Sequence, residues 1–271
     1  MKNTILETFL VDSFTSEPFK GNPAGVCLTE HLLTEELMLK IAQEIGYSET
    51  AFVRKKENQT VFGIRFFSPV MEIPICGHAT LAAAKVILSK LDTDQITFIN
   101  IEGVRLDISK NECGLTMLLP MYDTTKADCP PQVISALGIS EVLNVEHNQE
   151  TNILLLEIAS TKELVELTPN YEALYRAHDT INGVLVTARG DDAYDFHSRY
   201  FWPWSGTNED PVTGGSHMFL TNYWSKRLGK LKMKSFQASQ RTGAMEVEIV
   251  KSQKVAITAD ATIILSGTLQ V

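Results

Sequence analysis

The stretch RFFSPVMEIPICG at residues 65–77 recurs in altered form as RYFWPWSGTNEDPVTG at residues 199–214. Both follow the pattern Arg-aromatic-Phe-x-Pro, a spacer, and Glu-x-Pro-x-x-Gly, and both run into an apolar stretch typical of a buried helix. The spacer has two residues in the first half and five in the second. Chance similarity of two strand–loop–helix units is the alternative, but six identities in register favour a duplicated domain with pseudo-twofold symmetry.

A duplicated chain places its natural binding cleft between the two halves. The two glycine-containing helix starts, at Gly77 and Gly214, would offer backbone N–H groups and positive dipole ends to an anion in that cleft. The repeat therefore predicts a small carboxylate-bearing ligand.

Local patterns along the chain mix helices and strands, which indicates an α+β fold. Thr34 is a suitable N-cap for a helix that runs through Glu44 and ends at Gly46, and 77–91 reads as a buried helix. The polar stretch 123–131 is the best candidate for a linker between two domains. We expect an N-terminal domain at 1–122 and a C-terminal domain at 123–271, and leave open that the last strand, about 262–271, returns to the first domain.

Composition excludes several classes of protein. The chain has 271 residues, 44% hydrophobic and 21% charged, which is enough for two packed cores. A net charge of −9 with scattered lysines and arginines argues against nucleic-acid or membrane partners. The N-terminus lacks the unbroken apolar core of a secretory signal, no apolar run approaches the ~18 residues of a membrane span, and the four cysteines form no framework. These features predict a cytoplasmic protein.

Glu49 is the first candidate for chemistry. It lies in a Ser-Glu-Thr turn between a predicted helix end and the apolar run 51–53. Apolar surroundings would raise its pKa from ~4.3 towards neutrality and suit it to carry a proton between carbons. A solvated turn acid is the alternative, and position alone favours that alternative.

Three more residues are weighed in the same way. His78 follows Gly77 at a helix start, where the dipole favours the neutral imidazole, although a lone histidine is more often structural. Asp210 occupies the equivalent loop of the second half, where helix capping is the alternative. Cys76 could be a racemase thiol, but its repeat counterpart is Thr213, so a buried small hydrophobe is favoured.

Metal and cofactor motifs are missing from the sequence. There is no HExxH, and the six histidines (31, 78, 147, 178, 197, 217) show no close pairing. There is also no GxGxxG after a strand, no GxxxxGK[ST] and no GxSxG. We expect neither a metal nor a dissociable cofactor.

Six motifs occur in order along the chain: GNPAGV at 21–26, SET at 48–50, RFFSP at 65–69, CGHAT at 76–80, SRYF at 198–201 and EDPVTG at 209–214. Together they resemble the phenazine-biosynthesis isomerase family (PhzF-like proteins), relatives of diaminopimelate epimerase. The resemblance implies two similar domains, each a curved mixed β-sheet wrapped around a central helix. It also implies a cofactor-free homodimer with its active site in the cleft.

The resemblance also implies roles for particular residues. Glu49 would shuttle a proton between carbons of a cyclohexadiene acid, with His78 and Asp210 assisting. Gly77 and Gly214 would hold the substrate carboxylate through backbone N–H groups. The remaining substrate-binding positions would be Asn22, Ser48, Ala79, Thr213 and Gly215.

Two positions depart from the family pattern. Gly215 stands where members usually have serine, and Thr242 replaces a glycine of the motif Q-x-S-x-R-G-G. The first change points to an altered substrate. The sequence thus predicts a cofactor-independent isomerase acting on a small carboxylate, with an epimerase or racemase of an amino-acid-like substrate, or a non-catalytic small-molecule-binding or interaction protein of the same fold, as alternatives.

Overall fold

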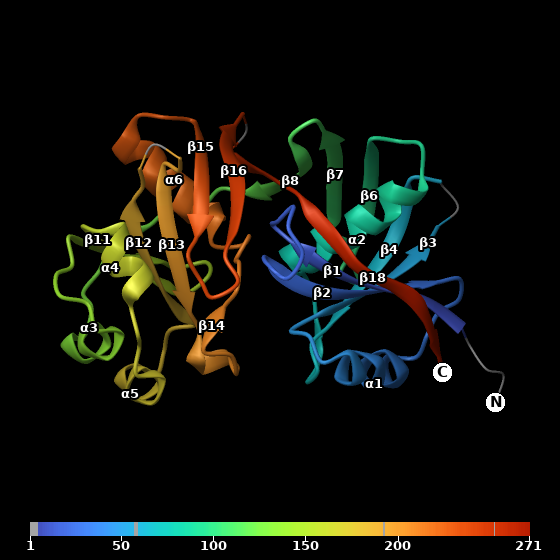
Figure 1. Cartoon of the computed structure of the whole chain (residues 1–271), viewed down its shortest axis with the longest axis horizontal. Coiled ribbons are helices and arrows are strands. Elements are labelled where there is room, and N and C mark those ends of the chain that lie inside the picture. Colours follow the sequence, from blue (N-terminus) through green and yellow to red (C-terminus); the bar gives the residue numbers. More distant parts are fainter. Residues whose placement is uncertain (1–4, 57–58, 192, 252) are drawn as a thin grey trace. The chain divides into compact units, whose positions relative to one another are not determined.

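The computed structural model describes residues 5–56, 59–191, 193–251 and 253–271. The chain forms two compact units (Figure 1). The first comprises Met1–Leu118 and Thr258–Val271, and the second comprises Leu119–Ile257. Both combine sheets with a few helices, which confirms the predicted α+β class.

The first unit contains two helices, α1 (Glu35–Ile45) and α2 (Gly77–Lys90). Its strands are β1 (Ile5–Ser13), β2 (Asn22–Thr29), β3 (Thr50–Lys55), β4 (Val61–Phe67), β5 (Glu72–Ile73), β6 (Gln95–Ile99), β7 (Arg105–Asn111), β8 (Gly114–Pro120) and β18 (Ala261–Gln270). The C-terminal strand β18 pairs along almost the whole of β1, so the chain's last segment belongs to the first unit.

The second unit has four helices, α3 (Pro131–Leu137), α4 (Thr161–Glu166), α5 (Tyr171–Ala177) and α6 (His217–Leu228), and a 3-10 turn, η1 (Pro203–Ser205). Its strands are β9 (Thr125–Lys126), β10 (Asn144–Asn148), β11 (Ile153–Ile158), β12 (Gly183–Arg189), β13 (Phe196–Phe201), β14 (Glu209–Asp210), β15 (Lys232–Gln237), β16 (Gly243–Val250) and β17 (Lys254–Ala259). The chain passes from the first unit to the second within β8 and returns within β17.

The two units repeat one topology. In the first, β2 and β3 are parallel, β3 and β4 antiparallel, β4 and β6 parallel, and β6 and β7 antiparallel. In the second, the same relations hold for β11, β12, β13, β15 and β16. Even the register is shared, because Phe67 faces Glu72 as Phe201 faces Glu209. The predicted duplication is therefore confirmed by the strand order.

Each unit wraps its sheet around one buried helix and places amphipathic helices outside. In the first unit, α2 carries ten buried residues among its 14 and lies inside the curved strands, whereas α1 lies outside (Figure 1). The predicted ends of α1 are confirmed: the Thr34 hydroxyl accepts the Leu37 N–H, and Gly46 ends the helix at φ 72°. The outer core of the first unit contains Met38 and Ile41 of α1 against Phe52 and Phe67 of the sheet.

The second unit differs from the sequence prediction at its central helix. We expected the helix to start at Gly214, but α6 begins at His217. The N–H groups of His217 and Met218 bond to the carbonyls of Gly214 and Gly215 at 3.1 and 3.2 Å, so a tight turn precedes the helix. Glycine pays a large entropy cost in a helix, which favours the turn at this position.

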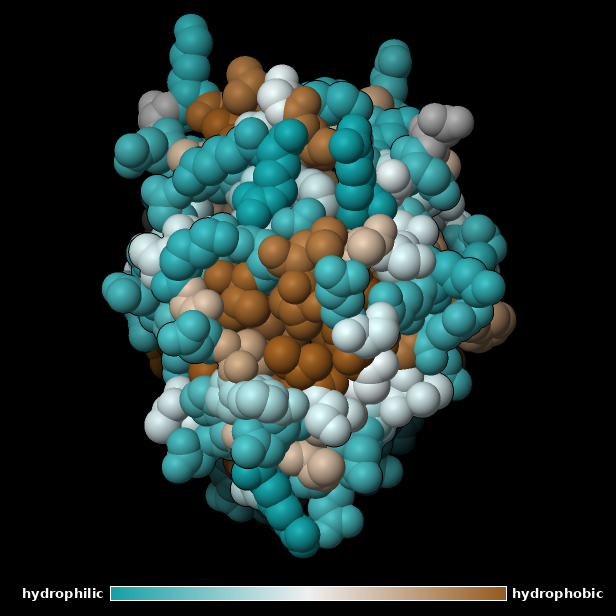
Figure 2. Space-filling model, turned by 90° about the vertical axis from the view of Figure 1, so that its left-hand side faces the viewer, coloured by the Kyte–Doolittle hydropathy of each residue, from teal (hydrophilic) through white to brown (hydrophobic). Residues whose placement is uncertain are grey.

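The outer core of the second unit lies under α3, α4 and α5. Partly buried hydrophobic side chains surround it, namely those of Ala127, Cys129, Ile134, Val142, Val145, Tyr171, Ala177 and Trp204. Figure 2, which faces this unit, shows hydrophobic residues gathered in the middle of the face and hydrophilic ones around them. Within the described ranges, every helix is too short or too polar to cross a bilayer.

An arginine–glutamate pair fixes the same corner of both units. Arg65 donates from Nε and Nη2 to the Glu72 carboxylate at 2.6 and 2.5 Å, and Arg199 donates to Glu209 at 2.8 Å from both atoms. Arg199 is the more buried of the two, and its Nη1 also donates to the carbonyl of Leu167 at 2.7 Å, next to the end of α4. The pair joins the long strand to the short strand that leads into the central helix.

Replacing each of these arginines by lysine should lower the free energy of unfolding by different amounts at the two positions. Arg199→Lys should lower the free energy of unfolding by about 2–4 kcal/mol, because one ammonium cannot serve both the buried Glu209 carboxylate and the backbone carbonyls. Arg65→Lys is the matched control at the equivalent, more exposed position, and should cost about 1 kcal/mol or less. Urea unfolding followed by circular dichroism measures both, and equal losses would contradict this account.

Candidate active site

Glu49 is placed by backbone pairing at the start of β3. Its carbonyl accepts a hydrogen bond from the Gly25 N–H at 3.1 Å, which ties the Ser-Glu-Thr turn to β2. The side chain of Glu49 is 14% exposed. The carboxylate is therefore mostly withdrawn from water but still reachable, so the solvated-acid alternative does not describe it.

His78, the second residue of α2, lies directly against Glu49. Its Nε2 is 3.1 Å from Oε2 of Glu49 and 3.4 Å from the Ser48 hydroxyl. The Cys76 sulfur lies 3.4 Å from Nδ1 and 3.9 Å from Nε2 of the same ring. The backbone carbonyl of His78 accepts the Ser13 hydroxyl at 2.8 Å, which fixes this first turn of the helix.

Both predicted pKa directions are wrong, for one physical reason. Burial raises the pKa of Glu49, but the hydrogen bond and charge of His78 outweigh burial and hold that pKa below its usual value. Burial lowers the pKa of His78, but the neighbouring Cys76 and Glu49 side chains outweigh it and hold that pKa well above its usual value. The two directions and the 3.1 Å contact describe an ion pair between the Glu49 carboxylate and a protonated His78 ring.

Cys76 belongs to the same cluster. It is the N-cap residue of α2, and its side chain is buried. Burial raises the pKa of its thiol, so Cys76 stays protonated and donates a hydrogen bond to Glu49. The sequence reasoning treated it as a small hydrophobe and missed this contact, although its position two residues before His78 was a usable signal.

One group in the described ranges could in principle hold a metal ion. Glu49, Cys76 and His78 each offer one ligand atom, and the three atoms lie within 4.8 Å of one another. These atoms already satisfy each other through the ion pair and hydrogen bonds, so the arrangement needs no ion to explain it.

The other predicted substrate-binding residues of the first unit differ in their exposure to solvent. Ser48 is exposed, whereas Asn22 and Ala79 are fully buried in β2 and α2. The Ala79 N–H bonds to the Cys76 sulfur. The N–H groups of Gly77 and His78 precede the first intrahelical bond of α2, from Thr80 N to the Cys76 carbonyl, and are the donors left for an anion.

In the second unit, Asp210 ends β14 and is followed by a loop that is tied down from β15 and the residues after it. Asp210 accepts a hydrogen bond from the Thr213 hydroxyl. Gln237 accepts the Thr213 N–H at 2.9 Å and donates to the Asp210 carbonyl at 2.8 Å, and the Ser239 hydroxyl donates to the Pro211 carbonyl at 2.5 Å. Gln237 and Ser239 thus position the loop, a role that sequence reasoning did not assign to them.

Gly215, the first departure from the family pattern, has open space around it. A Cβ atom at this position would have only the Met218 Cε within 4 Å, at 4.0 Å. A serine would fit sterically, so packing does not account for the glycine.

The repeat shows where the two units diverge. Thr50 pairs with Phe67 as Val184 pairs with Phe201, so the counterpart of Glu49 is Gly183. A Cβ at Gly183 would lie 2.5 Å from the Tyr200 ring, which leaves no room for a side chain. By the same alignment, Gly215 is the counterpart of His78. Among the residues that the structure describes, the cluster of Glu49, Cys76 and His78 therefore has no counterpart in the second unit.

The Glu49–His78 ion pair predicts a measurable change in titration. His78→Asn should raise the pKa of the Glu49 carboxyl above its wild-type value, because burial then acts without the opposing positive charge. A ¹³C NMR titration of carboxyl-labelled glutamates measures this, with the resonance assigned by Glu49→Gln. Ser48→Ala is the control and should move the pKa upward by less; an unchanged pKa in His78→Asn would contradict the pairing.

Thr242, the second departure, has a φ of 56°, in the left-handed region that disfavours β-branched residues. Thr242→Gly should raise the free energy of unfolding by about 1 kcal/mol, because it relieves that strain. Thr242→Ala is the matched control, since it removes the hydroxyl but keeps the strained Cβ, and it should bring no gain. Urea unfolding of the three proteins tests this, and an equal effect of both substitutions would refute it.

Comparisons with known proteins identify relatives of this chain. A phenazine-biosynthesis-like domain-containing protein of Bos taurus is 39% identical, with 97% of this chain and 99% of the relative covered. An uncharacterized isomerase of Pseudomonas aeruginosa is 37% identical, with 97% and 98% covered. The crystal structure of a PhzF-family protein of Enterococcus faecalis has a TM-score of 0.91 at 34% identity, covering 99% of this chain and 100% of that one.

A more distant likeness concerns the fold alone. A hydroxyproline epimerase of Agrobacterium vitis, solved with bound trans-4-hydroxy-L-proline, has a TM-score of 0.58 at 9% identity and covers 98% of this chain and 93% of that one. The family model described as phenazine biosynthesis-like protein matches residues 11–267, almost the whole chain. The chain belongs to the PhzC/PhzF family of phenazine-biosynthesis-like proteins.

Proposed function

We propose that this protein is an isomerase that moves a proton between carbons of a small carboxylate-bearing substrate, with Glu49 as the acid–base group. The observation that carries the proposal is the Glu49–His78 ion pair, 3.1 Å long and mostly buried at the start of α2. The name of the Pseudomonas aeruginosa relative, an isomerase, points to the same class of reaction.

The charge state of the cluster suits the first half of such a reaction. The pKa of Glu49 lies below its usual value, so Glu49 is ionised at neutral pH and can accept a proton from a substrate carbon. His78 holds its own proton on Nε2 and keeps the carboxylate oriented. The step breaks one C–H bond and forms the O–H bond of the carboxylic acid, and the electron pair moves into the substrate.

The second half returns the same proton. Glu49 donates it to a different carbon of the same molecule, a new C–H bond forms, and the double bond ends in a new position. No atom is gained or lost, so the reaction needs no added co-reactant. The adjacent His78 cation and Cys76 thiol favour the ionised form of Glu49 and so drive this release.

Substrate binding in this proposal rests on backbone donors. The N–H groups of Gly77 and His78 at the α2 terminus would bind a carboxylate, aided by the helix dipole. From the family motif we propose that Asp210, Thr213, Gly214 and Gly215 also contribute to substrate recognition. The bonds from Gln237 support this, because they hold the loop in one conformation.

A two-thiol epimerase is less well supported by these residues. Cys76 has a raised pKa, which disfavours a thiolate base. Its counterpart in the second unit is Thr213, whose hydroxyl bonds to Asp210. Glu49 thus remains the best placed proton carrier in the cluster.

The proposal is tested by ¹H NMR in D₂O with dihydro-hydroxyanthranilate, the cyclohexadiene acid of the family reaction. Wild-type protein should shift the ring double bonds or incorporate deuterium at carbon, and Glu49→Gln should be slower by about 10²–10⁴-fold because it cannot accept a proton. Glu44→Gln, an exposed glutamate five residues earlier, is the matched control and should match the wild type.

The same samples separate the alternatives. Exchange of the α-proton of trans-4-hydroxy-L-proline, without reaction of the cyclohexadiene acid, would favour an epimerase. Binding of the acid with equal affinity by wild type and Glu49→Gln, with no turnover by either, would favour a non-catalytic binding protein. Full activity of Glu49→Gln would refute the role of Glu49.

A further inference from the structure

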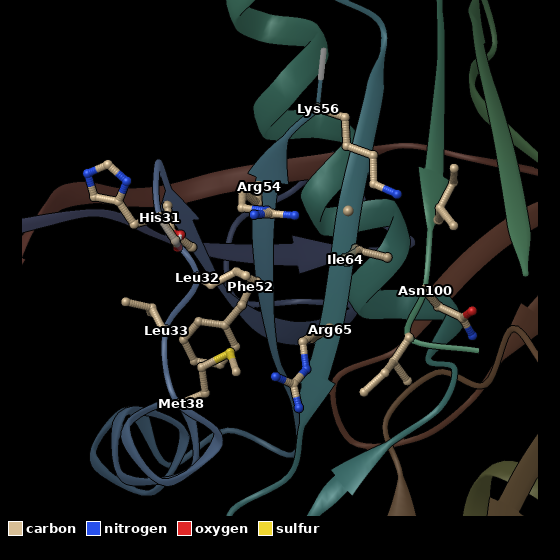
Figure 3. A pocket seen from close by; sticks show the side chains of 14 residues that line it. His31, Leu32, Leu33, Met38, Phe52, Arg54, Lys56, Ile64, Arg65 and Asn100 are labelled. Atoms are coloured by element: carbon tan, nitrogen blue, oxygen red, sulfur yellow. Dashed lines mark hydrogen bonds between the residues drawn. The ribbon is translucent and has the colours of Figure 1, made fainter. Parts of the chain in front are cut away.

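A hollow lies on the outer face of the first unit, beside the outer end of β3 (Figure 3). It measures about 590 Å³, with the open space above it included. None of the cluster residues Glu49, Cys76 and His78 lines it. Phe52 and Arg54 of β3, Gly63 of β4 and Met38 of α1 form much of its wall.

The hollow exists because one strand position lacks a side chain. Gly63 pairs with Arg54 on β3 and with Ile99 on β6, so it lies in the middle of three adjacent strands. A Cβ at Gly63 would meet only the Lys56 Cε at 3.6 Å and the Arg54 carbonyl at 3.9 Å, both ordinary contacts. A larger side chain would therefore fit the backbone and fill the space.

The charged side chains that line the hollow are cationic, although Glu35 lies 3.7 Å from one of them, Arg65. Its lining includes Arg54, Lys56 and Arg65 and contains no acidic residue, although the chain as a whole has a net charge of −9. Arg65 is engaged by Glu72 at 2.5 Å. Within the described ranges, the side chains of Arg54 and Lys56 have no hydrogen bond or ion pair, so their positive charge is uncompensated.

Apolar side chains also line the hollow beside these cations, and some of them are open to solvent. Leu32 is 74% exposed, Ile101 is 56% exposed, and Figure 3 shows Leu32, Leu33, Phe52 and Met38 grouped beside the cationic side chains. Exposed leucine and isoleucine next to unpaired cations match a ligand that has an apolar body and one anionic end.

We propose that this hollow binds a small amphipathic organic anion, a carboxylate on an apolar chain or ring, outside the acid–base cluster. Arg54 and Lys56 bind the carboxylate, and Leu32, Phe52 and Ile101 cover the apolar part. The absence of a side chain at Gly63 makes the hollow deep enough to hold the ligand. β3 begins directly after Glu49, so an occupant of this hollow packs on the strand that carries the catalytic turn.

Titration with octanoate, followed by ¹⁵N–¹H NMR, tests the proposal on the whole chain. The amides of Phe52 and Gly63 should shift and saturate. Arg54→Gln combined with Lys56→Gln should weaken binding at least about tenfold, the loss expected for hydrogen bonds to a charged group. Gly63→Val should abolish binding by filling the hollow. Lys55→Gln, an exposed lysine between the two cations that does not line the hollow, is the matched control and should bind like the wild type.

Other outcomes would overturn the proposal. If neutral octanol shifts the same amides at equal or lower concentration, the cations do not select an anion. If the double variant binds octanoate like the wild type, the site lies elsewhere. If the same amides shift with protein concentration alone, a second copy of the chain covers the hollow instead. Because the double variant changes only surface charge, it keeps the test decisive even if Gly63→Val fails to fold.

Discussion

The arginine–glutamate pair at the entry to each central helix is the constraint on which both units depend. It joins the end of a long strand to a two-residue strand, and so fixes the corner from which the chain runs toward the next helix. The spacers between these strands differ by three residues, yet the register of Phe67 with Glu72 equals that of Phe201 with Glu209. The extra residues of the second unit lie in the spacer 204–208, which follows Pro203 and includes the end of the turn Pro203–Ser205. The bidentate geometry thus holds the corner while the loop varies.

The two units share this scaffold but carry different side chains at matching positions. Glu49 and His78 form an ion pair in the first unit, whereas glycines occupy the matching positions in the second. Gly183 cannot regain a side chain, because the Tyr200 ring fills the place where a Cβ would stand. In the second unit, hydrogen bonds from Gln237 and Ser239 instead hold the loop that follows Asp210. The buried ion pair and the hydrogen bonds that position the loop are thereby divided between two copies of one fold.

The ends of helix α1 could be predicted from the sequence because neighbouring residues determine them. The candidate site was harder to predict because it depends on contacts between residues far apart in the chain. Thr34 and Gly46 mark the ends of α1 through their own side-chain and backbone preferences. The start of α6 was not predictable, because Gly214 and Gly215 suit a turn as well as a helix start. The role of Gln237 was hidden for another reason: it bonds to residues 24 and 27 positions earlier, and no local pattern encodes that contact.

The two incorrect pKa predictions show how strongly the side chains of the cluster affect one another. Burial alone would raise the pKa of Glu49, and burial and the helix dipole would both lower that of His78. At 3.1 Å, His78 reverses the effect of burial on the pKa of Glu49, and Cys76 together with Glu49 reverses the effect of burial on the pKa of His78. The pair is electrically neutral as a whole, so an acidic protein can bury it without a net charge. A carboxylate held this way is ready to accept a proton, and the neighbouring cation then favours its release. One side chain can therefore serve as base and acid in turn, which a proton transfer between carbons of one molecule requires.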